Sequence, residues 1–233
     1  MPHYYFYGFD VYYLILILPA FFISLFAQVK IQSTFSKFSK VLNQSGLTGA
    51  SAAQKVLAAH GVYNVKVERV GGNLTDHFDP RTNVIRLSDS VYDSTSVASV
   101  GVAAHEAGHA VQYSQGYTPI KIRNSILPIV SFGSRFSFIA LLLGILFSFD
   151  FLITLGIILF SFATLFQLIT LPVELNASRR AMNTIKEENL LDENEARGAR
   201  KVLTAAAMTY IAAVIMSVAQ LLRLLLLTGR RRN

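Results

Sequence analysis

The sequence contains no cysteine, and charged residues make up only 15% of its 233 positions. The absence of cysteine excludes disulfide bonds and thiolate metal ligands, so any metal ion must be held by histidine and carboxylate side chains. The scarcity of charge accompanies 52% hydrophobic residues and a mean hydropathy of +0.44. Such a composition is too apolar for a soluble domain of this size and favours a membrane protein.

Acidic residues are scarcer than basic ones, 14 against 21, which gives a net charge of +7. A basic chain can bind nucleic acid, but these basic residues flank apolar stretches and form no basic face with interleaved aromatic residues. Anionic lipid headgroups and the positive-inside rule explain their positions better. We therefore expect a lipid bilayer as a partner, and no nucleic acid.

Four apolar runs are long enough to cross a bilayer. The first, residues 11–29, follows a segment without Lys or Arg and precedes no A-x-A cleavage site, so it is predicted to be an uncleaved transmembrane helix. Residues 126–149 and 151–171 are predicted to form a tight helical hairpin. Residues 202–227 are predicted to form a transmembrane or partly interfacial helix.

Two polar blocks lie between these runs, residues 30–121 and residues 172–201. The second block is predicted to be helical. The first is predicted to contain a helix over 48–60, strands over 63–70 and 83–87, and a helix from Ser94 or Ser96 to about Tyr113. Because the hairpin returns the chain to the same side of the membrane, the two blocks can together build one site at the membrane surface.

The helix predicted to end at Tyr113 carries an H-E-x-x-H motif, formed by His105, Glu106 and His109 in the segment GVAAHEAGHAVQY. Positions i and i+4 lie on one helix face, where two imidazoles can bind one Zn²⁺. Glu106 points about 100° away around the helix. From there a carboxylate can act on a water molecule as general base without binding the metal. The alternative is a chance match on an ordinary helix, but Gly108 inside the motif favours a packing or access role.

A catalytic zinc ion usually has three protein ligands, and the motif supplies two. No histidine follows His109, so the third must be a carboxylate or one of His3, His60 and His77. Glu174 is the sole acidic residue between the third apolar run and the next charged helix. A glutamate on a second helix is the gluzincin arrangement. The alternative for Glu174 is a solvated carboxylate at a helix start; with the motif present, we favour the ligand.

Several ordered blocks resemble one family. The segments are HEAGHAVQ, then two apolar runs and PVELNASRRA, together with DHFDPRTNVIRLS and the helix over 49–61. They resemble the YugP-like neutral zinc metallopeptidases of bacterial membranes, and the resemblance covers most of the chain. It implies peptide-bond hydrolysis with one Zn²⁺ per chain held by His105, His109 and Glu174, and with Glu106 as the base. The expected substrate is a peptide or a membrane protein.

A more distant likeness is to the HtpX and CAAX-prenyl-protease gluzincins, whose third ligand lies in an E-x-x-A-D pattern. This chain has Glu174 and Ala177 in place, but Ser178 where that pattern has aspartate. Ser178 is therefore a candidate for supporting the metal site in place of the aspartate. The resulting fold class is a mostly α membrane protein: about four transmembrane helices plus a small α+β zincin-like catalytic unit with an H-E-x-x-H helix and a short sheet.

Three further residues are candidates for contacts to the metal site or to substrate. His77 and Asp79 could act beside the metal or on an oxyanion, or could set the geometry of a turn. Tyr113 shares the motif face and could donate to an oxyanion, or could pack in the core. The strand over 83–87 could pair with an extended substrate, or be an ordinary interior strand.

The lysines suggest an orientation, since they follow the first apolar run and none precedes it. This places the N-terminus outside and the catalytic blocks on the cytoplasmic side of a bacterial cell membrane, in a multi-pass protein. The three arginines at 230–232 conflict with this orientation if the fourth run crosses the membrane completely, because they would then lie outside the cytoplasm.

Other functions fit less well. A site-2 intramembrane protease would carry its motif within a span together with an L-D-G segment, which this sequence lacks. A transporter would need partnered polar residues in several spans. A non-catalytic zinc-containing membrane scaffold or quality-control adaptor remains the alternative, although a structural zinc site has no need of Glu106. The sequence predicts neither the substrate specificity nor the oligomeric state.

Overall fold

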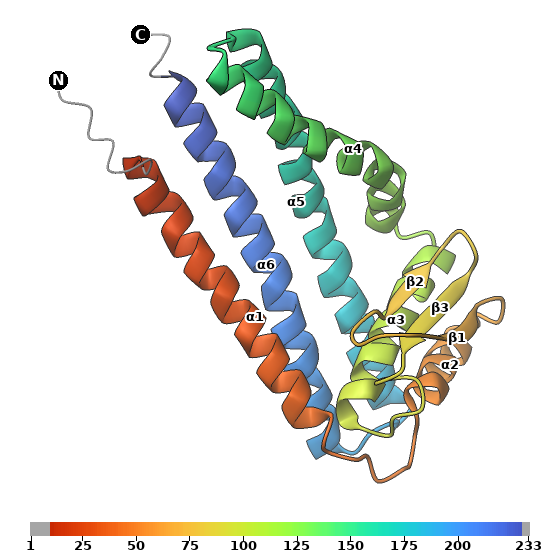
Figure 1. Ribbon diagram of the computed structural model, residues 1–233. Coiled ribbons are helices and arrows are strands. Elements are labelled where there is room, and N and C mark those ends of the chain that lie inside the picture. The colour runs from red at the N-terminus through yellow and green to blue at the C-terminus, as the bar shows by residue number, and fades with distance from the viewer. Residues whose placement is uncertain (1–9, 230–233) are drawn as a thin grey trace. The chain divides into compact units, whose positions relative to one another are not determined.

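A computed structural model describes residues 10–229 (Figure 1). The elements are the π-helical turn η1 (Tyr13–Ile17), the helices α1 (Leu18–Phe38), α2 (Gly49–Ala59), α3 (Val97–Ser114), α4 (Thr118–Leu146), α5 (Asp150–Glu187) and α6 (Glu193–Gly229), and the strands β1 (Lys66–Val70), β2 (His77–Asp79) and β3 (Val84–Ser88). Four helices are long and apolar enough to cross a membrane: η1 with α1, then α4, α5 and α6. The predicted fold class, a mostly α membrane protein with a short sheet, is confirmed.

The described chain forms two compact units. One comprises residues 10–28, 122–171 and 209–229, which include most of the apolar runs. The other comprises residues 29–121 and 172–208, which include both polar blocks. The long helices α1, α4, α5 and α6 contribute residues to both units. The runs predicted over 151–171 and 202–227 lie within longer helices, whereas the run predicted over 126–149 extends past the end of α4 at Leu146.

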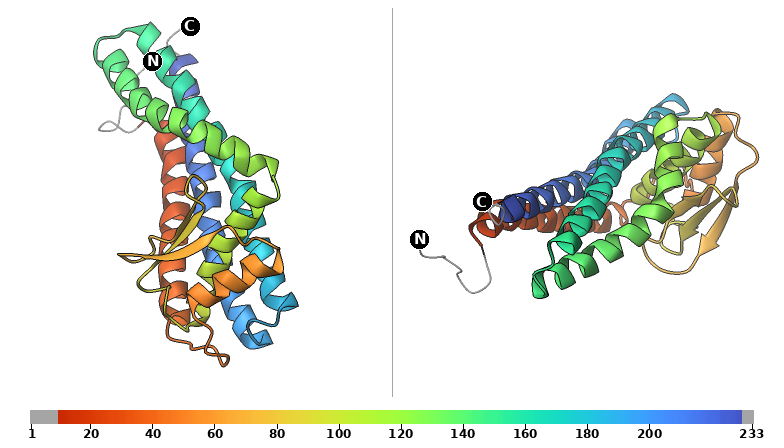
Figure 2. Two further views of the ribbon diagram at one scale, coloured as in Figure 1. Left: turned by 90° about the vertical axis from the view of Figure 1, so that its right-hand side faces the viewer. Right: turned by 90° about the horizontal axis from the view of Figure 1, so that it is seen from above.

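In the apolar unit, η1 and the first part of α1 lie along α6 (Figures 1 and 2). Ile17 and Ala20 are buried against Ala219. Arg223, which has no evident partner in the sequence, donates from Nε to an Asp10 carboxylate oxygen at 2.9 Å. Because an unpaired charge within a membrane is costly, this pair explains how α6 can carry an arginine in its apolar run.

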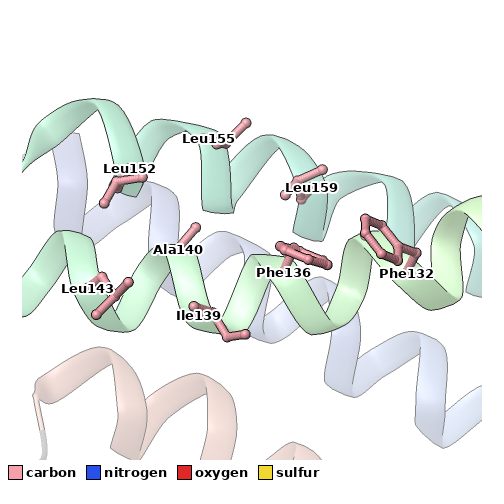
Figure 3. Close-up of a pocket in the computed structure, with 9 residues that line it drawn as sticks. Phe132, Phe136, Ile139, Ala140, Leu143, Leu152, Leu155 and Leu159 are labelled. Carbon is pink, nitrogen blue, oxygen red and sulfur yellow. The ribbon is translucent and has the colours of Figure 1, made fainter.

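The hairpin of α4 and α5 is held by a polar contact and by apolar packing. Ser137 Oγ on α4 donates to the backbone oxygen of Gly156 on α5 at 2.8 Å. A groove of about 350 Å³ lies between the two helices, lined by apolar side chains that include Phe132, Phe136 and Leu152 (Figure 3). Its lining offers hydrocarbon contact and no group that could hold a metal ion or move a proton.

The polar unit contains a three-stranded sheet in the order β1-β3-β2. β1 runs parallel to β3, and β2 runs antiparallel to it. β3 is therefore the interior strand, so its proposed pairing with a substrate is wrong, because β1 and β2 occupy both of its edges. β2 lies where the sequence indicated a turn.

The motif helix α3 lies at the centre of the polar unit, beside the sheet and α2 (Figure 1). Ser96 caps its N-terminus, since its hydroxyl oxygen accepts a hydrogen bond from the Ser99 N–H at 3.1 Å. Most of its small residues are buried, and its two glycines, Gly101 and Gly108, face α6 and α5 respectively. A Cβ at Gly108 would lie 2.7 Å from the Ala177 carbonyl oxygen on α5, whereas a Cβ at Gly101 would lie 3.4 Å from Ala199 Cβ on α6.

We predict that Gly108→Ala destabilises the protein while Gly101→Ala does not. The methyl group at residue 108 would overlap the backbone of α5, and such overpacking costs about 1–3 kcal/mol. At residue 101 the methyl group has room and improves helix propensity. Thermal unfolding of the detergent-purified variants, followed by helical circular dichroism, should show a lower midpoint for Gly108→Ala alone. Equal midpoints for the two variants would contradict the close approach of α3 and α5.

Candidate metal centre

Three side chains from two helices of the polar unit meet at one point. His105 and His109 come from α3, and Glu174 comes from α5. His105 Nε2 lies 3.3 Å from Glu174 Oε2, and His109 Nε2 lies 3.4 Å from the same oxygen. Within residues 10–229, these three are the group whose ligand atoms gather closely enough to hold a metal ion, all within 4.8 Å of one another.

The donor set and its burial fit Zn²⁺. Two imidazole nitrogens and one carboxylate oxygen are the ligands of a gluzincin zinc site, and zinc accepts this combination with a fourth position open. Glu174 is only 2% exposed, and the side chain of His109 is 9% exposed. A buried carboxylate needs a compensating positive charge, and a cation bound between Glu174 and the two Nε2 atoms would supply it.

Each histidine uses its other ring nitrogen to contact a polar side chain. His105 Nδ1 lies 3.1 Å from Ser178 Oγ, and His109 Nδ1 lies 3.0 Å from Gln112 Oε1. The structure thus places Ser178 beside His105. Sequence reasoning missed Gln112, although its position three residues after His109 puts it on the same helix face. Such outer contacts orient a metal-binding imidazole and select its tautomer.

Glu106 lies next to His105 on α3 and is partly buried. Burial raises the pKa of its carboxyl group to about 7, and the backbone N–H of Phe78 in β2 opposes that rise. A cation held by the three ligands would lower that pKa again. A buried carboxyl group beside the three ligands is placed to accept and return a proton, as the general base of a hydrolase does.

The Phe78 contact also shows which way β2 faces. Phe78 is paired with Ile85 of β3, yet its N–H is directed to Glu106. In an antiparallel pair, a residue whose N–H points away from its partner strand presents that N–H at the outer edge. The outer edge of β2 therefore faces the side of α3 that carries Glu106. Tyr113 contributes to the same area, because its ring packs on that of Phe78 with centroids 6.0 Å apart.

Asp79 organises the turn after β2. Its carboxylate accepts hydrogen bonds from the Arg81 N–H at 2.9 Å and the Thr82 hydroxyl at 2.8 Å, and it faces Arg86 at 3.3 Å. The turn interpretation thus accounts for the contacts of Asp79. His77 is exposed, with Nδ1 2.8 Å from the Thr75 carbonyl oxygen.

The other candidate histidines differ in position. His60 Nε2 contacts Thr184 Oγ1 at 2.9 Å, which ties the end of α2 to α5. Neither His60 nor His77 belongs to the cluster of ligand atoms found in the described part of the chain. His3 lies outside the described residues.

Asp76 was also missed by sequence reasoning as a neighbour of the site. It accepts hydrogen bonds from the Ser88 N–H at 2.7 Å and from the Ser88 hydroxyl, and burial raises its pKa. Its charge in turn contributes to the raised pKa of Glu106. No local pattern in the sequence predicts the contact between Asp76 and Ser88. It arises because β2, which begins just after Asp76, pairs with β3, which ends at Ser88.

Comparisons with known proteins identify the family to which the chain belongs. The model of the family described as "Putative neutral zinc metallopeptidase" matches residues 13–229. The chain is also 47% identical over 223 residues to the "Putative membrane protease YugP" of Bacillus subtilis (strain 168), an alignment that covers 95% of this chain and 99% of that protein. No solved structure matches significantly. A family match along nearly the whole chain, together with this identity, shows that the protein belongs to this family of neutral zinc metallopeptidases.

Proposed function

We propose that this protein is a membrane-embedded zinc endopeptidase of the gluzincin type. In this proposal His105, His109 and Glu174 hold one Zn²⁺ per chain, and Glu106 is the general base. The observation that carries it is the meeting of two imidazole Nε2 atoms with the buried carboxylate oxygen of Glu174. Glu106, which is partly buried, lies beside them. Membership of the family supplies the reaction class, zinc-dependent peptidase.

Zinc, when bound, would supply the Lewis acidity that polarises a scissile carbonyl and makes water a nucleophile near neutral pH. The protein supplies the proton transfers. Glu106 accepts a proton from the attacking water and returns it to the leaving amine. The N–H of Phe78 lowers the pKa of the Glu106 carboxyl, so the basicity of Glu106 depends on β2 as well as on α3.

The substrate in this proposal is a peptide segment in extended form, from a soluble peptide or from a membrane protein. The outer edge of β2 is the sheet edge that faces Glu106, as the direction of the Phe78 N–H indicates. Because the outward N–H of Phe78 is directed to Glu106, main-chain recognition at this edge rests on the outward Phe78 carbonyl, which can accept a hydrogen bond from an extended peptide. This assigns to β2 the role first considered for residues 83–87.

We further propose that the site works on the cytoplasmic side of a bacterial cell membrane. Lys30, Lys37 and Lys40 follow the first span, and α2 and α3 lie in the same polar block. The positive-inside rule then orients this block toward the cytoplasm.

The first test separates the base from the ligands. Glu106→Gln should retain about one zinc ion per chain, because Glu106 is not a ligand, and should cleave unfolded casein at least about 100-fold more slowly than wild type. Glu187→Gln, the same change at an exposed position on α5, is the matched control and should behave as wild type.

Zinc is measured by elemental analysis of protein purified in detergent without chelator, and cleavage by release of peptide. Full cleavage by Glu106→Gln would rule Glu106 out as the base. Zinc in wild type without cleavage of casein or of any other unfolded protein would contradict the peptidase proposal and favour the scaffold.

The second test uses the absence of cysteine. Lys55→Cys on α2 and Ser148→Cys in the α4–α5 turn are single-cysteine variants at exposed positions. In intact cells, a membrane-impermeant maleimide should label Ser148→Cys, and should label Lys55→Cys only after the membrane is permeabilised. The reverse pattern would place the site outside the cytoplasm.

A further inference from the structure

Gln112 is fully buried and lies between the two helices that supply the metal ligands. Its Oε1 lies 3.0 Å from His109 Nδ1. Its Nε2 donates two hydrogen bonds to α5, one to the Val173 carbonyl oxygen at 2.8 Å and one to Asn176 Oδ1 at 2.9 Å. Both N–H groups of this amide and one side of its oxygen are therefore occupied by identified groups.

The polarity of these contacts fixes the orientation of the Gln112 amide. A backbone carbonyl can only accept, so the group that faces Val173 must be the NH₂ end of the amide. The oxygen end then faces His109 and can only accept. His109 Nδ1 must consequently carry the hydrogen, which leaves the lone pair of the neutral ring on Nε2, directed toward Glu174 Oε2.

A second anchor leads to the same orientation from the other side. Arg180 Nε donates to Asn176 Oδ1 at 2.8 Å, and a guanidinium group has no acceptor. Asn176 must therefore present its oxygen to Arg180, and the same oxygen receives the Gln112 amide. Arg180 is itself held by a hydrogen bond to Gln115 Oε1 and by stacking on the Tyr117 ring.

His105 has no such constraint. Its Nδ1 contacts the hydroxyl of Ser178, and a hydroxyl can either donate or accept. Ser178 can follow whichever tautomer His105 adopts. The two histidines of the motif thus differ: the tautomer of one is dictated by groups that cannot reverse their polarity, and that of the other is not.

We propose that Gln112 is a positioning residue that commits Nε2 of His109 to the metal ion, with Val173 O and the Asn176–Arg180 pair locking its amide. This inference rests on the proposed metal site and adds a requirement to it. The requirement is polarity: position 112 must offer His109 an acceptor, and position 176 must offer an acceptor to both Gln112 and Arg180.

The variants separate polarity from packing. Gln112→Met keeps the side-chain length but removes the acceptor. Asn176→Leu removes the acceptor for Gln112 and Arg180, whereas Asn176→Asp keeps acceptor oxygens for both. Gln54→Met makes the same glutamine-to-methionine change at an exposed position of α2 and is the matched control.

Zn²⁺ affinity, measured by competition with a chromogenic chelator, should fall about 10–100-fold in Gln112→Met and in Asn176→Leu, which is typical for loss of a group that orients a metal ligand. Asn176→Asp and Gln54→Met should bind as wild type does. The visible absorption of the Co²⁺-loaded protein should change in the two weakened variants, because the His109 ring is no longer held in one orientation. Circular dichroism of the metal-free proteins reports whether each variant is folded.

Unchanged Zn²⁺ affinity in folded Gln112→Met would overturn the inference while leaving the proposed function standing. Equal loss in Asn176→Asp and Asn176→Leu would also overturn it, since polarity would then not be what matters at that position. If Gln112→Met fails to fold, the two Asn176 variants decide the question. If the wild-type protein binds neither Zn²⁺ nor Co²⁺, that result would contradict the proposed function itself.

Discussion

The close approach of α3 to α5 is the constraint on which the rest of the site depends. Gly108 leaves room for the carbonyl of Ala177, and a methyl group there would sit 2.7 Å from that oxygen. This contact brings Glu174 within reach of both histidines of the motif and Ser178 within reach of His105. It also lets Gln112 donate to the backbone of Val173. A wider separation would disrupt all of these contacts together, because each crosses the same interface.

Burial then determines how the polar groups at this interface must behave. Glu174 and Gln112 are almost completely enclosed, so every donor and acceptor on them needs a partner. Around Gln112 the partners are protein groups of fixed polarity, which leave a lone pair of His109 facing Glu174. Around Glu174 the nearest groups are imidazole nitrogens, and a cation satisfies a carboxylate and two imidazole lone pairs at once. The same low-dielectric surroundings raise the pKa of the Glu106 carboxyl to about 7.

Sequence reasoning anticipated those features that rest on local pattern. The apolar runs mark the helices long enough to cross a membrane, and the i, i+4 spacing puts His105 and His109 on one face. Two features that depend on distant parts of the chain were missed, the strand β2 and the role of Gln112. β2 has only three residues within a turn-rich segment, and its pairing with β3 gives it a strand conformation that its own sequence does not favour. Gln112 had no visible role because its partner on α5 is 61 residues away.

Zinc K-edge X-ray absorption on the purified protein tests the central claim most directly. The account predicts one zinc ion per chain with two imidazole ligands at about 2.0–2.1 Å, completed by oxygen and without sulfur. Glu174→Ala should keep both imidazoles and lose an oxygen ligand or the metal itself. A third imidazole, or a zinc ion without imidazole ligands, would contradict a site built from His105, His109 and Glu174.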